Sequence, residues 1–273
     1  MINYPDIDPI AFAIGPFEVF GRTMGPIAVH WYGLMYVVGF IAGWWLARRR
    51  AAMPGSTWKA VDVDDLIFFA AVGVILGGRL GWILVYGFDT IRADPLNIIR
   101  VWQGGMSFHG GLVGVMAAVA LFARRRGRNI ADVFDFTAPL PAIGLCAGRI
   151  GNFINGELWG KPTDLPWGML VKGEVLHPSQ MYEAALEGVV MFVILWWFTS
   201  TPRPRLAPAG LFLALYGTFR FVIEFVRVPD ANIGYLAFGW LTMGQLLSLP
   251  VLVTGLAMLG WAYTRRQPSG NYA

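Results

Sequence analysis

Seven long apolar stretches constrain the fold of this sequence more than any other feature. Each is about 20 residues long, the length that an α-helix needs to cross the roughly 30 Å hydrocarbon core of a bilayer. They cover approximately residues 26–47, 66–86, 107–123, 131–148, 181–198, 209–226 and 243–263. Backbone polar groups cannot stay unpaired in lipid, so such stretches should be helices, and the alternating strands of a membrane barrel are not seen. We therefore predict an all-α integral membrane protein with seven transmembrane helices.

The composition agrees with this class. Hydrophobic residues make up 56% of the chain and charged residues 14%, against about 45–50% and about 25% in soluble domains. The longest non-apolar stretch, 149–180, is too short to bury a core of its own. The first basic residue is Arg22, so a charged secretory leader is missing and the first apolar stretch should stay as an anchor. Residues 1–273 are expected to form a single polytopic membrane domain.

Basic residues occur in four short runs that orient the predicted helices. The runs follow the first, third, fifth and seventh apolar stretches, and Lys and Arg accumulate in cytoplasmic loops. An N-terminus outside and a C-terminus in the cytoplasm satisfies all four. Because the formal charge of +4 is spread over these runs, it indicates membrane topology rather than nucleic-acid binding. The runs are Arg48–Arg50 with Lys59, Arg124–Arg126 with Arg128, Arg203 with Arg205, and Arg265 with Arg266.

The polar residues of the apolar stretches fall on the outer side of this topology. A charged side chain at mid-bilayer costs roughly 2.5–3.5 kcal/mol on insertion scales, and such residues usually mark a function. Outside the basic runs, the three histidines, the arginines inside the stretches and the arginine that follows the fourth stretch are His30, His109, His177, Arg79, Arg220 and Arg149. All of them lie in the outer half. The sequence therefore predicts a polar cavity that faces outward.

His109 lies in the glycine-rich segment Gly104–Gly111, where the third predicted helix begins. Glycines allow unusual backbone conformations and close approach of a ligand, and imidazole is the natural general base near neutral pH. The alternative is a structural histidine that bonds loop carbonyls at the membrane interface. For His30 and His177 the structural interpretation is favoured, because their neighbours are typical of an aromatic belt and a helix cap.

The densest polar segment, Gly148–Gly160, combines several glycines with Arg149, Asn152 and Glu157. It would suit a re-entrant loop, which is tolerated at membrane depth only where it lines a cavity or is packed in protein. The planar guanidinium of Arg149 matches a phosphate or a carboxylate. Alternatively, Arg149 pairs with Glu157 and only holds the loop.

Charged residues also recur at helical spacing in the fifth and sixth stretches. Arg220, Glu224 and Arg227 share one helix face, and they form either a self-satisfied ladder or a site whose excess positive charge binds an anion. Glu183 and Glu187 stand four residues apart and could pair with arginines on other helices.

Small residues and the single cysteine receive structural interpretations. The segment Gly77–Gly81 has a weaker echo at Ala147–Gly151, and small residues allow membrane helices to pack closely. Cys146 cannot form an internal disulfide, and no Cys/His spacing typical of zinc is present. Neither a metal nor another cofactor is expected.

The order and content of these motifs resemble the bacterial prolipoprotein diacylglyceryl transferases. The matching segments are His30–Gly33, Gly105–Gly111, Gly148–Gly160, His177–Gln180 and Tyr216–Arg227. The resemblance implies a seven-helix enzyme of the bacterial inner membrane. It would move the diacylglyceryl group of phosphatidylglycerol to the lipobox cysteine of a preprolipoprotein, the first step of lipoprotein maturation, and release glycerol phosphate. The stretch between Gly160 and His177 is shorter than in some members, which leaves the role of that loop open.

The resemblance also implies a set of functional residues. His109 would be the general base for the substrate thiol, which has a reference pKa near 8.5 and is only a few per cent ionised at pH 7. Arg149 and Arg220 would stabilise the charge that develops on the departing phosphate. Glu157 and Glu224 would orient the arginines, and Asn152 and Tyr32 would hydrogen-bond the head group. The expected binding residues are Tyr32, Asn152, Glu157, Gly160 and Glu224.

A transporter of an anionic lipid or small anion is the main alternative. Transporters often have paired repeats and a mid-plane site between broken helices, whereas here the number of predicted helices is odd and the polar groups lie on the outer side. A retinal-type photoreceptor is excluded because no lysine lies in the last apolar stretch. The motifs of an intramembrane serine or zinc protease are also missing. The sequence therefore favours an enzyme that handles lipid.

Overall fold

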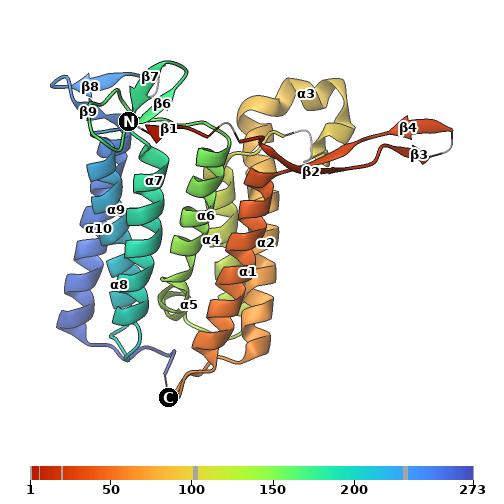
Figure 1. The fold of residues 1–273 in the computed structure, drawn as a ribbon. Helices are drawn as coiled ribbons and strands as arrows, with labels where there is room; N and C mark the ends of the chain where they lie inside the picture. The colour runs from red at the N-terminus through yellow and green to blue at the C-terminus, as the bar shows by residue number, and fades with distance from the viewer. Residues whose placement is uncertain (1, 6, 20, 101–103, 230–232, 273) are drawn as a thin grey trace. The chain divides into compact units, whose positions relative to one another are not determined.

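A computed structural model of the chain describes residues 2–272 except 6, 20, 101–103 and 230–232. The chain is mostly helical, as predicted (Figure 1). It divides into two compact units, each described by itself. The first unit comprises Met1–Leu46 and Asp135–Pro268, and the second comprises Ala47–Phe134 and Ser269–Ala273.

The first unit is built from helices around a small apolar core. The fully buried side chains of Ala142, Met191 and Leu195 pack against apolar residues of a neighbouring helix, among them Phe212 and Phe219. The helices are α1 (Trp31–Ala51, whose end belongs to the second unit), α6 (Leu140–Ile154), α7 (Ser179–Glu183), the π-helix η4 (Ala184–Val190), α8 (Met191–Phe198), α9 (Ala207–Ile223) and α10 (Met243–Arg265). Three helical segments, α7, η4 and α8, follow one another without a break and together cover Ser179–Phe198.

Short strands lie in the connections of the first unit. β1 (Ile2–Asn3) pairs parallel with β6 (Met169–Val171), which pairs antiparallel with β7 (Glu174–Leu176). The other pairs are antiparallel: β2 (Ile10–Ile14) with β5 (Ile27–His30), β3 (Phe17–Val19) with β4 (Arg22–Met24), and β8 (Tyr235–Ala237) with β9 (Leu241–Thr242). These strands were not predicted, because segments of two to five residues give too little periodic signal in a sequence.

Side chains that bond backbone groups fix the starts of α9 and α10. The Asp135 carboxylate accepts hydrogen bonds from the N–H groups of Leu206 at 2.7 Å and Ala209 at 3.0 Å. Thr242 Oγ1 accepts from the Gln245 N–H at 3.1 Å, and Gln245 Oε1 accepts from the Thr242 N–H at 2.9 Å. This reciprocal capping box satisfies amide groups that a helix leaves unpaired at its N-terminus. Thr242 Oγ1 also donates a hydrogen bond to Glu224, so Glu224 lies beside the start of α10.

The second unit is organised around two closely packed helices, α2 and α4. A Cβ atom added at Gly77 would lie 2.4 Å from the Gly110 carbonyl oxygen, and one at Gly114 would lie 2.1 Å from the Gly73 carbonyl oxygen. The interpretation of Gly77–Gly81 as a close packing surface is therefore confirmed. The helices of this unit are α2 (Ala60–Trp82), the π-helix η1 (Ile83–Gly87), α3 (Phe88–Ala93), the 3₁₀-helix η2 (Pro95–Ile98), α4 (Phe108–Arg125) and most of α5 (Ile130–Thr137).

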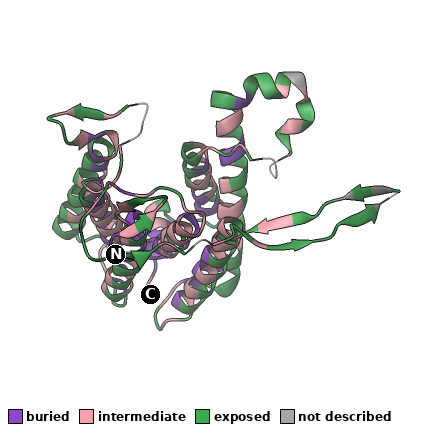
Figure 2. Cartoon of the chain, turned by 45° about the horizontal axis from the view of Figure 1, so that its top comes forward, coloured by how far each residue is buried: buried purple, intermediate pink, exposed green. Residues whose placement is uncertain are grey.

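Several helices have the length and hydropathy of membrane spans. Within the described residues these are Ala60–Arg92, Ser179–Phe198 and Met243–Arg265, with α5 and α6 as a fourth candidate that is bent by 49°. Large apolar side chains on the helices are exposed, including Leu84 at 76% and Trp197 at 71%. Figure 2 shows exposed residues along the helices of the chain. So much exposed apolar surface is consistent with a membrane protein. Each of the seven predicted stretches falls largely on helical structure, and the crossing of the membrane by all seven stays a prediction.

The helix boundaries correct two details of the sequence interpretation. Residues 27–30 pair in β5, so the first helix begins at Trp31 rather than near residue 26. The fourth stretch breaks between α5 and α6, and α6 continues to Ile154. Residues 148–154 are therefore helical, and only the part of the segment after Ile154 is a loop. Gly151 lets the α1 residue Tyr32 lie directly against α6, since an added Cβ would be 2.9 Å from the Tyr32 ring.

Candidate active site

Helix α6 carries Arg149 and Asn152 near its C-terminal end. Arg149 Nε lies 2.9 Å from Glu183 Oε2, an ion-pair distance, yet that oxygen accepts no hydrogen bond. Arg149 Nη1 contacts Asn152 Oδ1 at 3.5 Å, the outer limit for a hydrogen bond. Arg149 is therefore held in place mainly by charge, and most of its N–H groups have no acceptor among the residues that the structure describes.

Glu157 reaches Arg149 only through Asn152. Asn152 Nδ2 donates to Glu157 Oε1 at 2.8 Å, and Asn155 Nδ2 contacts the same oxygen at 3.4 Å. The alternative that Arg149 and Glu157 form an ion pair is wrong, and the expected orientation of Arg149 by Glu157 stays a prediction that would act through Asn152. Glu157 lies beyond the end of α6, whereas Glu183 on the neighbouring helix α7 is in direct contact with the guanidinium.

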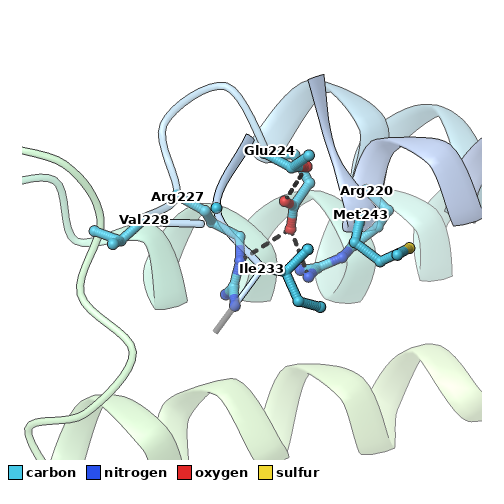
Figure 3. A pocket seen from close by; sticks show the side chains of 9 residues that line it. Arg220, Glu224, Arg227, Val228, Ile233 and Met243 are labelled. Atoms are coloured by element: carbon cyan, nitrogen blue, oxygen red, sulfur yellow. Dashed lines mark hydrogen bonds and ion pairs between the residues drawn. The ribbon is translucent and has the colours of Figure 1, made fainter. Parts of the chain in front are cut away.

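Arg220, Glu224 and Arg227 form an ion-pair group where α9 ends (Figure 3). Glu224 Oε1 lies 2.6 Å from Arg220 Nη2 and 3.1 Å from Arg227 Nε. Its other oxygen accepts a hydrogen bond from Thr242 Oγ1 at 2.7 Å. The expectation that Glu224 orients Arg220 agrees with this geometry. A small pocket opens beside the group, and Ile233 and Met243 add apolar atoms to its lining.

Glu183 connects the two arginine groups. Its Oε1 atom accepts hydrogen bonds from Arg220 Nη1 at 2.6 Å and Arg227 Nη1 at 2.7 Å, while Oε2 faces Arg149. The side chain has no exposed surface. A buried carboxylate needs such partners, because burying an unpaired charge is costly. Glu183 is not in the functional set expected from the sequence, although its spacing to Glu187 indicated pairing with arginines on other helices.

Glu187 lies one turn after Glu183 in the continuous helical segment Ser179–Phe198, but its contacts differ. It is also fully buried, but neither of its carboxyl oxygens accepts a hydrogen bond from a described residue. It lies on the π-helix η4. Glu187 is therefore outside the network of ion pairs that Glu183 holds together.

Gly160 allows two backbone segments to approach beside Arg227. Its N–H donates to the His177 carbonyl at 2.9 Å. A Cβ atom at this position would lie 2.5 Å from the Val226 carbonyl oxygen. The requirement for glycine is thus explained by packing. Ser179 Oγ donates to the Leu158 carbonyl at 2.9 Å, which ties the same loop to the start of α7.

Tyr32 lies in the first turn of α1, next to the helix that carries Arg149 and Asn152. Its hydroxyl is 3.1 Å from the hydroxyl of Tyr36, and its ring packs against Gly151. This places Tyr32 in the same unit as the arginines.

His109 belongs to the second unit, where it is the second residue of α4. The cap of that helix is Ser107, whose Oγ accepts from the Gly110 N–H at 3.2 Å. The His109 ring is exposed and makes an edge contact with Phe108. The loop-to-helix junction expected from the sequence is therefore present.

Arg79, also in the second unit, has a structural role in the described contacts. It is buried, and its guanidinium donates to the carbonyls of Ile98, Gly104 and Gly105 at 3.1, 2.6 and 2.9 Å. These bonds hold the connection between α2 and α4 in place.

His177 agrees with its structural interpretation. Its Nδ1 atom lies 3.2 Å from the Tyr182 hydroxyl, which accepts a hydrogen bond from Trp167 Nε1 at 2.8 Å. Partial burial, together with the positive charge of Lys161, lowers the pKa of His177 below its usual range. The Tyr182 hydroxyl can donate a hydrogen bond to Nδ1 of the neutral ring.

The geometry of the first unit suits recognition of an oxyanion. Arg149, Arg220 and Arg227 converge on Glu183, and their planar guanidinium groups match phosphate or carboxylate oxygens. Such preorganised cations stabilise developing negative charge more strongly in a dry site than in water.

Comparisons with known proteins point to one family. A family model described as prolipoprotein diacylglyceryl transferase matches residues 19–261. A phosphatidylglycerol–prolipoprotein diacylglyceryl transferase of Ectopseudomonas mendocina is 53% identical over 274 residues, covering 99% of both chains. Proteins of the same name from Oleidesulfovibrio alaskensis and Pseudomonas aeruginosa are 56% and 55% identical, covering 96% and 97% of both chains, respectively.

Proposed function

The chain belongs to the prolipoprotein diacylglyceryl transferase family, and we propose that it transfers the diacylglyceryl group of phosphatidylglycerol to the lipobox cysteine of a preprolipoprotein. The observation that carries this proposal is the convergence of Arg149 and Arg220 on Glu183, which suits a phosphodiester. The names of the relatives support a transferase and do not favour the alternative of an anion or lipid transporter.

The proposed reaction forms one bond and breaks one. His109 removes the proton of the substrate thiol, and the thiolate sulfur attacks the glyceryl carbon of the lipid. The bond between that carbon and the phosphate oxygen breaks, so its electron pair stays on the departing glycerol phosphate. Arg149 and Arg220 stabilise this added negative charge.

The remaining residues of the set have supporting roles in this proposal. Glu224 holds Arg220, and Glu157 acts on Arg149 through Asn152. The Tyr32 hydroxyl and the Asn152 side chain would hydrogen-bond the head group of the lipid, together with those N–H groups of Arg149 that have no acceptor among the described residues.

The proposal includes a place in the cell. The whole chain forms one polytopic domain with seven membrane spans in the bacterial inner membrane, the N-terminus outside and the site in the outer half of the bilayer. The apolar spans found in the structure and the distribution of basic runs in the sequence support it.

A transfer assay tests the proposed activity. Purified protein in detergent is incubated with a lipobox peptide and phosphatidylglycerol labelled in its diacylglyceryl part. Label should appear on the peptide cysteine, and a peptide with serine at that position should remain unlabelled. The absence of label on the cysteine peptide in the presence of folded protein would refute the proposed function.

A variant of His109 tests the proposed base. His109→Gln keeps hydrogen-bonding groups but cannot take up a proton at neutral pH, so turnover should fall by about 10²–10⁴-fold. The KM for phosphatidylglycerol should change little. Near-normal turnover in this variant would assign His109 a structural role at the start of α4.

A further inference from the structure

A single buried carboxylate contacts three arginines of the first unit. Glu183 contacts Arg149, Arg220 and Arg227, which come from α6, α9 and the turn after α9. Its side chain has no exposed surface. No other carboxylate among the described residues contacts all three arginines. A change at Glu183 must therefore affect every arginine of the cluster.

The contacts of Glu183 are of two kinds. Its Oε1 atom accepts true hydrogen bonds from Arg220 and Arg227 at 2.6 and 2.7 Å, and these fix the planes of two guanidinium groups. Oε2 is within ion-pair distance of Arg149 but accepts no hydrogen bond. Arg149 is thus attracted to the cluster while its hydrogen-bonding edge stays available to a ligand.

We propose that Glu183 is a positioning residue for phosphate recognition: it locks Arg220 by hydrogen bonding and keeps Arg149 in reach by charge alone. This rests on the proposed transferase function and adds a residue to it. Glu183 does not touch the lipid in this arrangement. It acts by fixing the two cations that stabilise the departing phosphate, and misplacing catalytic groups by about 1 Å can cost about 10²-fold in rate.

The start of α7 supports this role, because it fixes the position of Glu183 itself. Ser179 Oγ donates to the Leu158 carbonyl at 2.9 Å, and the buried Gln180 side chain donates to the Glu157 carbonyl. The helix that carries Glu183 is therefore tied to the loop whose Glu157 side chain holds Asn152. One rigid connection positions both sides of the Arg149 guanidinium.

Two substitutions at Glu183 separate geometry from charge. Glu183→Gln keeps the shape and one acceptor oxygen but removes the charge that attracts Arg149. Glu183→Asp keeps the charge but is shorter by one methylene group, so it cannot reach all three arginines. If positioning matters, both variants should lose about 10²-fold in kcat. The KM for phosphatidylglycerol should change by less than about threefold, because the cations that attract the lipid remain.

Glu187→Gln is the matched control. Glu187 is an equally buried glutamate one turn away that accepts no hydrogen bond from the arginines. Its variant should retain turnover within about threefold of the parent protein. The measurement is the labelled transfer assay with varied phosphatidylglycerol, together with thermal unfolding of each variant in detergent.

The outcomes are decisive in either direction. A loss of kcat in both Glu183 variants, with folded protein and a normal Glu187→Gln enzyme, supports the proposal. Near-parental kcat in either Glu183 variant overturns it, and so does an equal loss in Glu187→Gln. Failure of both Glu183 variants to fold would assign the residue to folding and overturn the positioning role. If the parent chain itself transfers no label, the proposed function is what fails.

Discussion

The contact between α2 and α4 gives a prediction whose magnitude follows from the structure. A Cβ atom at Gly114 would lie 2.1 Å from the Gly73 carbonyl oxygen and 2.8 Å from the Gly77 Cα. Both are backbone atoms and cannot rotate away, so the helices must separate. Overpacking of this kind costs about 3 kcal/mol, while replacing a helical glycine by alanine gains about 1 kcal/mol. Gly114→Ala should therefore destabilise the protein by about 2 kcal/mol.

A neighbouring glycine on the same helix provides the control. A Cβ atom at Gly111 would meet its nearest neighbour, the Val74 carbonyl oxygen, at 3.6 Å, an ordinary contact. Gly111→Ala should therefore keep the helix-propensity gain without the clash. The gain cancels when the two variants are compared, so their difference of about 3 kcal/mol reports the clash alone. At about 2–4 °C per kcal/mol for a chain of this size, it corresponds to about 6–12 °C.

Thermal unfolding in detergent measures this difference. Tryptophan fluorescence is a suitable signal because the chain has 12 tryptophans. Both variants are scanned at one heating rate, since irreversible unfolding makes the midpoint rate-dependent. A midpoint for Gly114→Ala equal to or above that of Gly111→Ala would refute the close packing of α2 against α4.

Two further predictions concern pH and topology. Because the pKa of His177 is lowered in the folded chain, the unfolded chain binds more protons as the pH falls below the ordinary histidine value of about 6.5, and stability should decrease there. His177→Gln should remove that part of the pH dependence of the unfolding midpoint, and an unchanged dependence would contradict the assignment. Reporter fusions should give a cytoplasmic signal after the four basic runs and an outside signal near Lys172; a cytoplasmic signal at Lys172 would place the arginine cluster in the wrong half of the membrane. The cytoplasmic fusion points are Arg50, Arg126, Arg205 and Arg266.

The amino-acid sequence was sufficient to identify features that depend on neighbours along the chain. Apolar stretches of about 20 residues predict helices whatever packs around them, because backbone groups must be paired in lipid. The Arg220–Glu224 pair follows from its i, i+4 spacing. The glycines of α2 indicated close packing because a small residue permits it in any partner helix. The family resemblance also lies within the sequence motifs themselves.

Tertiary structure decided which partners distant residues have. Spacing suggested Glu157 as the partner of Arg149, whereas the ion pair is made by Glu183, 34 positions along the chain, on another helix. Helical periodicity gives no reason to distinguish Glu183 from Glu187. In the structure, however, the Glu183 carboxylate contacts three arginines, whereas that of Glu187 accepts no hydrogen bond from a described residue. The physical reason is that a buried charge is stabilised by whichever cation the fold brings within about 4 Å. That distance is set by how helices pack, and the local sequence contains no record of it.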